Sequence, residues 1–200
     1  MRVYVATTNS GKRREMESLF RNSAFELATF GDYVGPLEGD TSYAENAALK
    51  ARALHAQLQR AGRPAHVLAD DSGLEVFALD RRPGVLSAYY GGVDASWAER
   101  RKKLLDELSI AAEDDRRARF VCALHFIGRD GREFATMGTV DGTIAAKERG
   151  DLGFSFDPIF RYAQSEQTFA EMTETEKNCV SHRAIAAAAL LAAVEAAGVA

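Results

Sequence analysis

The sequence predicts an α/β fold with a mixed β-sheet, because short apolar runs typical of buried strands alternate with longer amphipathic stretches typical of helices. Two further observations support this class. The segment Gly128-Arg129-Asp130-Gly131 joins two apolar runs, as in an antiparallel hairpin. Two hundred residues with 46% hydrophobic side chains suffice for one well-filled domain, so residues 1–200 are expected to form a single domain.

In the first half of the chain, apolar runs and capping signals predict two strands and two helices. Val3–Thr7 and Val67–Ala69 have the length and composition of buried strands. One helix is expected over Arg13–Phe20. A longer one is expected over Ser42–Ala61, because Ser42-x-x-Glu45 has the form of a capping box and a glycine follows the last residue.

The second half is expected to hold the strands Leu74–Leu79, Arg119–Ile127, Arg132–Val140 and Thr168–Met172, and the helices Ser96–Leu108 and His182–Ala197. Ser96-x-x-Glu99 is a second capping-box pattern, which marks the start of its helix. The last helix is apolar nearly all round, so we expect it in the core or at a subunit contact.

Charge and composition exclude several classes of protein. A net charge of −4 gives no overall basic field that would recruit nucleic acid. Cys122 and Cys179 form neither a disulfide framework nor a metal-ligand pattern, which favours a reducing compartment. The longest apolar run, Ala184–Val194, is about half of the ~20 residues that span a bilayer. We therefore expect a cytoplasmic protein without a nucleic-acid or membrane partner.

The first candidate site lies between the first strand and the first helix and comprises Thr7, Thr8, Asn9, Ser10, Gly11 and Lys12. Free backbone amides and the positive end of a helix dipole favour an anion at such a place, and Lys12 adds a full charge. The segment is not a P-loop, because the first glycine and the Ser/Thr after the lysine are missing. A capped helix with a surface lysine is the alternative interpretation.

Carboxylates gather in the second and third candidate sites. Asp70-Asp71-Ser72-Gly73 follows a buried strand, at the sheet edge where α/β proteins bind ligands. Since neighbouring strand residues point to opposite faces, one aspartate is expected to serve a site and the other to be structural. Asn46 and Lys50 share one helix face. Glu38, in an acidic loop, is a candidate ligand for a hard cation. A turn in which an aspartate caps backbone amides is the alternative.

Two further clusters lie near the end of the chain. Gly153-Phe154-Ser155-Phe156-Asp157 combines two aromatic rings with a carboxylate, which are the parts of a base-stacking platform. Two core phenylalanines and a turn aspartate are the alternative. His182 and Arg183 begin the last helix, where the dipole disfavours cations, so a ligand contact is a plausible use for them.

In their joint order these motifs resemble the ITPase family, the purine nucleoside triphosphate pyrophosphatases, over nearly the whole chain. The matching stretches are Thr7–Lys12 with Glu15, Tyr43–Ala47 with Lys50, Ala69–Leu74, Pro83–Val85, Gly153–Phe154 with Asp157–Phe160, Ala170–Met172, Glu176–Asn178 and Ser181–Arg183. The resemblance implies an elongated mixed sheet flanked by helices, two lobes with a central cleft, and a homodimer.

The resemblance also implies an activity: Mg²⁺-dependent hydrolysis of non-standard purine triphosphates such as ITP, dITP and XTP to the monophosphate and pyrophosphate, which would keep such bases out of DNA and RNA. Thr7–Lys12 would surround the phosphates, with Lys50 as a second cation. Asp71 would bind Mg²⁺ and accept a proton from the attacking water, Glu38 would help to hold the metal, and Ser72 would touch the substrate. The sugar and base would be enclosed by Phe154, Ser155, Phe156, Asp157, Lys177, His182 and Arg183.

Three positions depart from the family pattern. Tyr89 stands where an arginine is expected, Ser155-Phe156 replaces a glycine–tyrosine pair, and Val140 replaces a frequent tryptophan. These changes affect one cationic contact and the stacking surface, and none removes a residue assigned to the chemistry. Two alternatives remain open: a related pyrophosphatase for modified pyrimidine triphosphates, and a protein that senses purine nucleotides without cleaving them.

Overall fold

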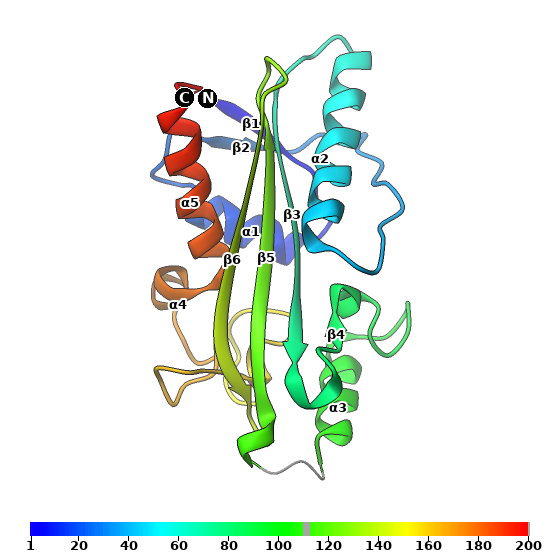
Figure 1. Ribbon diagram of the computed structural model, residues 1–200, viewed down its shortest axis with the longest axis vertical. Helices are drawn as coiled ribbons and strands as arrows, with labels where there is room; N and C mark the ends of the chain where they lie inside the picture. The colour runs from blue at the N-terminus through cyan, green and yellow to red at the C-terminus, as the bar shows by residue number, and fades with distance from the viewer. Residues whose placement is uncertain (110–112, 200) are drawn as a thin grey trace. The chain divides into compact units, whose positions relative to one another are not determined.

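The computed structural model describes residues 1–109 and 113–199, and in this part of the chain a mixed seven-stranded sheet is flanked by five α-helices (Figure 1). The strands are β1 (Arg2–Val5), β2 (Glu26–Ala28), β3 (His66–Val76), β4 (Pro83–Gly84), β5 (Arg117–Ile127), β6 (Glu133–Ile144) and β7 (Phe160–Tyr162). The helices are α1 (Ser10–Leu19), α2 (Tyr43–Arg60), α3 (Trp97–Glu107), α4 (Glu174–Val180) and α5 (His182–Ala196). The strand order is β2-β1-β3-β5-β6-β7, with β4 paired to β3. Because β1 runs parallel to β2 and β3 whereas β7 runs antiparallel to β6, the predicted mixed α/β class is confirmed.

The chain divides into two compact units. Unit 1 comprises Met1–Asp71, Cys122–Gly138 and His182–Ala200, and unit 2 comprises Ser72–Val121 and Thr139–Ser181. One boundary therefore falls inside β3, between Asp71 and Ser72. The single domain, the elongated shape and the central cleft stay predictions.

In unit 1, α1 and α5 cover one face of the sheet and α2 covers the other (Figure 1). Alternate residues of a strand therefore enter different cores. Leu68 of β3 packs in one cluster with Met16 of α1 and Leu190 of α5. Its neighbour Ala69 packs in another cluster with Leu54 of α2. The same alternation continues after Leu68, and it decides to which face of the sheet each of the two aspartates of β3 points.

The last helix packs against the sheet as its apolar sequence predicts. Ala186 and Leu190 are fully buried. The backbone of α5 approaches β6 so closely that a Cβ at Gly138 would lie 2.2 Å from the carbonyl oxygen of His182, so only glycine fits there. Among the described helices, none is by itself long and apolar enough to span a bilayer, and α4 with α5 meets that criterion only as a pair bent by 62°.

Three local expectations were wrong. β3 runs unbroken through Asp70-Asp71-Ser72-Gly73, so this segment is the middle of a strand rather than its end, and the strand expected over Leu74–Leu79 is its continuation as far as Val76. A Cβ at Gly73 would lie 2.1 Å from the carbonyl oxygen of Gly84, so glycine here serves the close β3–β4 pairing instead of a turn. The strand expected over Thr168–Met172 is reduced to an isolated bridge at Thr168.

Four short elements were not expected from the sequence: β2, β4, β7 and α4. α4 is capped by a reciprocal box, in which the Thr173 side chain accepts from the amide of Glu176 while the Glu176 carboxylate accepts from the amide of Thr173. The Thr173-x-x-Glu176 pattern was therefore a readable signal, of the same kind as Ser96-x-x-Glu99, which does begin α3 as predicted.

Candidate functional site

Three charged side chains of unit 1 meet on the α2 face of β3. The Nζ atom of Lys50 lies 2.9 Å from Asp71 Oδ1 and 3.0 Å from Glu38 Oε2. Asn46, one turn before Lys50 on α2, donates from Nδ2 to the other Asp71 oxygen, at 3.3 Å. The strand, the helix and the acidic loop thus bring together residues that are widely separated in sequence, including both predicted metal ligands.

The protonation properties of this cluster suit proton transfer. Burial raises the pKa of Asp71 above its usual value, although Lys50 and Lys12 act in the opposite direction. Burial alone would lower the pKa of Lys50, but the charges of Asp70, Asp71 and Glu38 raise it above its ordinary value. Lys50 is therefore a permanent cation, and Asp71 is a better proton acceptor than an exposed aspartate.

Asp70 points to the opposite face, where it is buried among charged partners. Its Oδ2 atom lies 3.0 Å from Lys12 Nζ and 3.6 Å from Arg183 Nε. Arg183 in turn donates from Nη1 to Glu15 Oε2 at 2.6 Å, and all of these groups except Lys12 are buried. Burial would raise the pKa of Asp70, but Lys12, Arg183 and Lys50 together hold it well below its ordinary value. The prediction that the two aspartates point to opposite faces is confirmed, and the assignment of a structural role to one of them stays a prediction.

The loop before α1 is a capped helix start. The Oδ1 atom of Asn9 accepts hydrogen bonds from the amides of Gly11 and Lys12, at 2.9 and 3.1 Å, and Thr7 Oγ1 accepts one from the amide of Asn9. The expectation of free amides is therefore wrong for Gly11 and Lys12, because the cap already uses them. Thr8 and Ser10 are exposed, so their hydroxyl groups are available to an anion.

The donor set on the α2 face fits Mg²⁺ bound jointly by protein and substrate. Mg²⁺ usually takes one or two carboxylates, with waters and phosphate oxygens completing the octahedron. Glu38 and Asp71 provide two carboxylates that already converge on a single cation, the ammonium group of Lys50. No group of three or more His, Cys, Asp or Glu side chains placed to hold a metal exists among the residues the structure describes. An all-protein metal cage is thus not what this site offers.

In unit 2, the glycine-led loop is organised by Asp157. The Oδ2 atom of this residue accepts from the amide of Phe154 at 2.8 Å and from Lys177 Nζ at 2.7 Å. A Cβ at Gly153, whose φ is +74°, would lie 2.2 Å from the same oxygen. Lys177 Nζ also lies 5.1 Å from the ring centroid of Phe154, a cation–π distance. The partly exposed Phe154 ring is thereby held in one orientation, which suits a surface for stacking.

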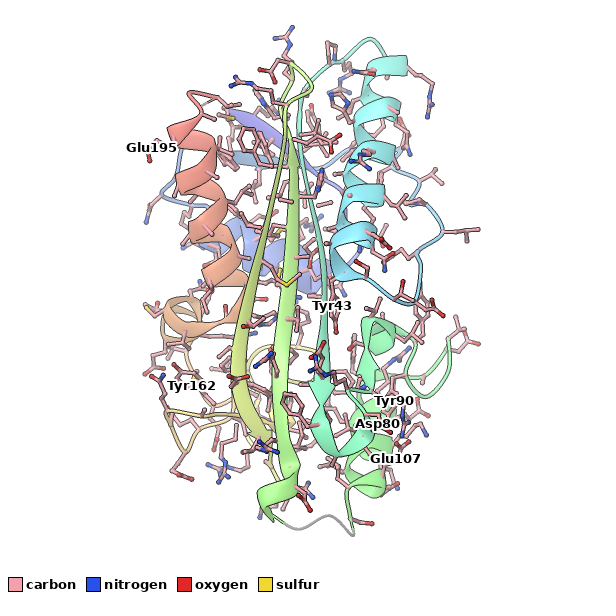
Figure 2. The ribbon with its side chains drawn as sticks, viewed as in Figure 1. Tyr43, Asp80, Tyr90, Glu107, Tyr162 and Glu195 are labelled. Carbon is pink, nitrogen blue, oxygen red and sulfur yellow. The ribbon has the colours of Figure 1, made fainter. Side chains whose placement is uncertain are left out.

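The expectation that the Phe156 ring belongs to the stacking surface is wrong. Its side chain is 0% exposed and packs edge-on against Trp97, with ring centroids 5.5 Å apart, and against Tyr90 at 6.5 Å. Tyr90 lies beside Glu107 (Figure 2), and burial, together with this carboxylate, raises the pKa of its phenol. The core alternative therefore holds for Phe156, because a ring enclosed on all sides cannot stack on a base in this conformation.

The remaining predicted site residues are Ser72, Ser155, His182 and Arg183. Ser72 lies in β3 and, by strand alternation, points to the same side as Asp70 rather than Asp71. Ser155 has a left-handed backbone (φ +61°) within its loop, and its carbonyl accepts from Arg101. His182 and Arg183 are buried in unit 1, where Arg183 is paired with Glu15 and Asp70; their role toward a base stays a prediction.

Glu15 has no predicted role, although its position in the sequence contained a signal. Glu15 precedes Met16 on the buried side of α1, and a carboxylate on an apolar helix face requires a partner. The identity of that partner, Arg183 of α5, became visible only with the fold.

The chain is similar to known proteins over nearly its whole length. The chain matches the model of the Ham1 family over residues 3–193. It is 39% identical over 197 residues to a dITP/XTP pyrophosphatase of Exiguobacterium sibiricum (97% of each chain) and 44% identical over 186 residues to one of Geobacillus kaustophilus (91% of this chain, 88% of the relative). The structure of a HAM1 protein from Coxiella burnetii superposes with a TM-score of 0.82 at 34% identity, covering 98% of this chain and 99% of the other. The resemblance predicted from the motifs is thus confirmed.

Proposed function

This chain belongs to the Ham1 family, and we propose that it hydrolyses non-standard purine nucleoside triphosphates, such as dITP, XTP and ITP, to the monophosphate and pyrophosphate. The names of relatives that are 39% and 44% identical support the substrate class. The observation that carries the proposal is the meeting of Glu38 and Asp71 at Lys50, a cation placed between two carboxylates on one face of the sheet. Removal of these substrates would keep non-standard bases out of DNA and RNA.

Asp71 accepts the proton of the attacking water in this mechanism. The pKa of Asp71 is raised toward neutral pH, and a general base is most effective when its pKa lies near the operating pH. Asn46 and Lys50 hold the two oxygens of Asp71, so the orientation of the base is fixed before substrate arrives. Catalysis by such a site is mainly positioning and charge stabilisation.

Lysine side chains offset the phosphate charge. A triphosphate carries about four negative charges, and screening limits attraction to roughly 8 Å at physiological salt, so contacts rather than the field of this acidic protein must bind it. Lys12 and Lys50 are the cations assigned to this task, and the exposed hydroxyl groups of Thr8 and Ser10 would complete the contacts.

Glu38 and Asp71 would hold the Mg²⁺ that we propose as cofactor. Bound Mg²⁺ supplies positive charge to phosphate oxygens and lowers the pKa of a coordinated water. The chain itself contributes the two carboxylates, which both contact the ammonium group of Lys50.

Selectivity follows from the hydrogen-bonding edge of the base. Hypoxanthine and xanthine carry a 6-oxo acceptor and an N1–H donor, whereas adenine carries a 6-amino donor and an unprotonated N1. Donors fixed for the 6-oxo group would be left unpaired by adenine, at a cost of ~1–3 kcal/mol each. Sites of this kind reject a mismatched analogue by up to ~10⁴-fold. Phe154, oriented by Lys177, is the candidate stacking surface for the base.

One assay tests the proposal. Purified protein with Mg²⁺ is given ITP, ATP, GTP and modified pyrimidine triphosphates, and the products are identified as monophosphate plus pyrophosphate or diphosphate plus phosphate. ITP should exceed ATP and GTP by orders of magnitude in kcat/KM. Comparable ATP hydrolysis would refute the selectivity, a preference for pyrimidines would favour the related pyrophosphatase, and binding without product would favour a nucleotide sensor.

The resemblance also leads us to propose a cytoplasmic homodimer. Light scattering of the purified protein measures the mass directly, and a mass of 21.8 kDa, that of one chain, would contradict the dimer.

A further inference from the structure

The loop that carries Glu38 is fastened to α2 at two points by side-chain amides of that helix. Gln57 donates from Nε2 to the carbonyl of Val34 at 2.7 Å and accepts from its amide at 3.0 Å. Asn46 donates from Nδ2 to the carbonyl of Gly39 at 2.9 Å and accepts from its amide at 2.8 Å. Each side chain therefore satisfies both backbone groups of one loop residue, as a neighbouring strand would. We call residues 34–39 the strap; in Figure 1 this loop runs alongside α2.

The two helix residues that hold the strap are about as far apart along α2 as the strap could reach when extended. Asn46, Lys50 and Gln57 are four and seven residues apart, so they form one stripe on α2. Eleven residues of helix span about 16 Å. The five residue steps from Val34 to Gly39 reach at most about 17–18 Å when extended. Pro36 further stiffens the segment by fixing its own φ. Glu38, one residue before the Asn46 attachment, therefore has little freedom to leave the site.

Two apolar side chains of the strap bury little surface. The side chains of Val34 and Leu37 are 71% and 97% exposed. Tyr33, immediately before the strap, packs against the α2-face core and so anchors its beginning. The polar contacts that fasten the strap are the two amide pairs and the ion pair between Glu38 and Lys50. Loss of the Gln57 pair would leave Tyr33 as the anchor at the end distant from Glu38 and would give the residues between Tyr33 and Gly39 slack.

We propose that Gln57 is a positioning residue that sets the affinity of the site for Mg²⁺ by keeping Glu38 within reach of Asp71. This inference rests on the proposed function, because it takes the two carboxylates as the metal ligands. Gln57 itself touches neither carboxylate in the described contacts; it acts through the backbone of the strap.

The test uses the full chain with Gln57→Met, which keeps the length of the side chain and removes both hydrogen bonds. Gln59→Met is the matched control, because Gln59 is exposed and lies two residues further along α2, on another side of the helix. Mg²⁺ affinity is measured by calorimetry without nucleotide, and the mobility of residues 34–39 by backbone hydrogen exchange in metal-free protein. Steady-state kinetics give the Mg²⁺ concentration for half-maximal activity and kcat at saturating Mg²⁺.

Gln57→Met should bind Mg²⁺ roughly threefold to tenfold more weakly, since a smaller share of molecules has the strap in place. Exchange in the strap should be faster, and kcat at saturating Mg²⁺ should stay within about twofold of wild type because the metal restores the loop. Gln59→Met should match wild type. An unchanged Mg²⁺ affinity, or unchanged exchange, in Gln57→Met overturns the inference alone. A wild-type protein that neither binds Mg²⁺ nor releases pyrophosphate overturns the proposed function and the inference together.

Discussion

Asp70 and Asp71 are adjacent in the chain, yet their carboxylates belong to opposite faces of β3. Asp70 Oδ2 lies 3.0 Å from Lys12 of α1, whereas Asp71 Oδ1 lies 2.9 Å from Lys50 of α2. The surroundings lower the pKa of the first and raise that of the second. Two identical side chains thereby have opposite pKa shifts, which suit Asp70 to a fixed core charge and Asp71 to its proposed role as proton acceptor.

Asp71→Asn should reduce kcat at least ~10²-fold, the lower range for loss of general-base help. The fold should persist, because burial already disfavours the charged form of this residue and an amide oxygen can still accept from Lys50. Pyrophosphate release and the midpoint of thermal unfolding measure the two effects. Near-normal turnover in a folded variant would remove Asp71 from the role.

Asp70→Asn should instead destabilise the fold, by about 3–5 kcal/mol, because it leaves Arg183 and Lys12 without their shared carboxylate. The effect depends on pH in a defined direction. Since the pKa of Asp70 is lowered on folding, its contribution is fully present above the unfolded value of about 3.9 and is lost as the pH falls below it.

Urea unfolding of both proteins at pH 7 and at pH 3 measures this contribution. The difference in unfolding free energy between wild type and Asp70→Asn should be largest at pH 7 and smaller at pH 3. A constant difference would show that the Asp70 charge does not stabilise the fold.

Lys50→Met should bind Mg²⁺ more tightly without nucleotide, by about tenfold or ~1.4 kcal/mol, although it hydrolyses substrate more slowly. The ammonium group of Lys50 lies at the point where Glu38 and Asp71 converge, so it competes with a metal for the same oxygens. Calorimetry at pH 8 provides the measurement. Weaker Mg²⁺ binding in the variant would mean that Lys50 organises the carboxylates rather than competing for them.

Phe154→Leu and Phe156→Leu form a matched pair. The first should raise the KM for ITP about tenfold, because stacking on a base contributes ~1–3 kcal/mol, with little change in stability. The second should lower the unfolding free energy by about 1 kcal/mol and leave KM nearly unchanged, since Phe156 packs only within the core. Kinetics with ITP and urea unfolding separate the outcomes, and equal KM effects would refute the assignment of Phe154.

The local parts of this site were predictable from sequence because they follow chain periodicity. Strand alternation alone assigned Asp70 and Asp71 to different faces, and helix spacing placed Asn46 and Lys50 together. The glutamine at position 57 gave no such signal: on a helix surface it is indistinguishable from Gln59, and only the path of the strap gives it a role.

Contacts between distant segments were not predictable. The pairing of Glu15 with Arg183 joins the first helix to the last, and nothing in either local pattern specifies the other partner. Phe154 and Phe156 are equivalent in the sequence of their loop, and the left-handed backbone of Ser155 between them accompanies very different burial of the two rings. α4 was missed because seven residues contain too few turns to show a helical period, and only its capping pattern Thr173-x-x-Glu176 could have indicated it.

Because β3 is one unbroken strand, the number of residues in this stretch of the chain is constrained. Its pairing with β1 fixes Leu68 opposite Val5. A single residue inserted between Leu68 and Asp70 would therefore turn every later side chain of the strand to the other face. The carboxylate of Asp71 would then point into the α1 core, and that of Asp70 would point toward α2. A point substitution in this stretch changes one side chain on one face, but an insertion or deletion of one codon there would exchange the two faces at once.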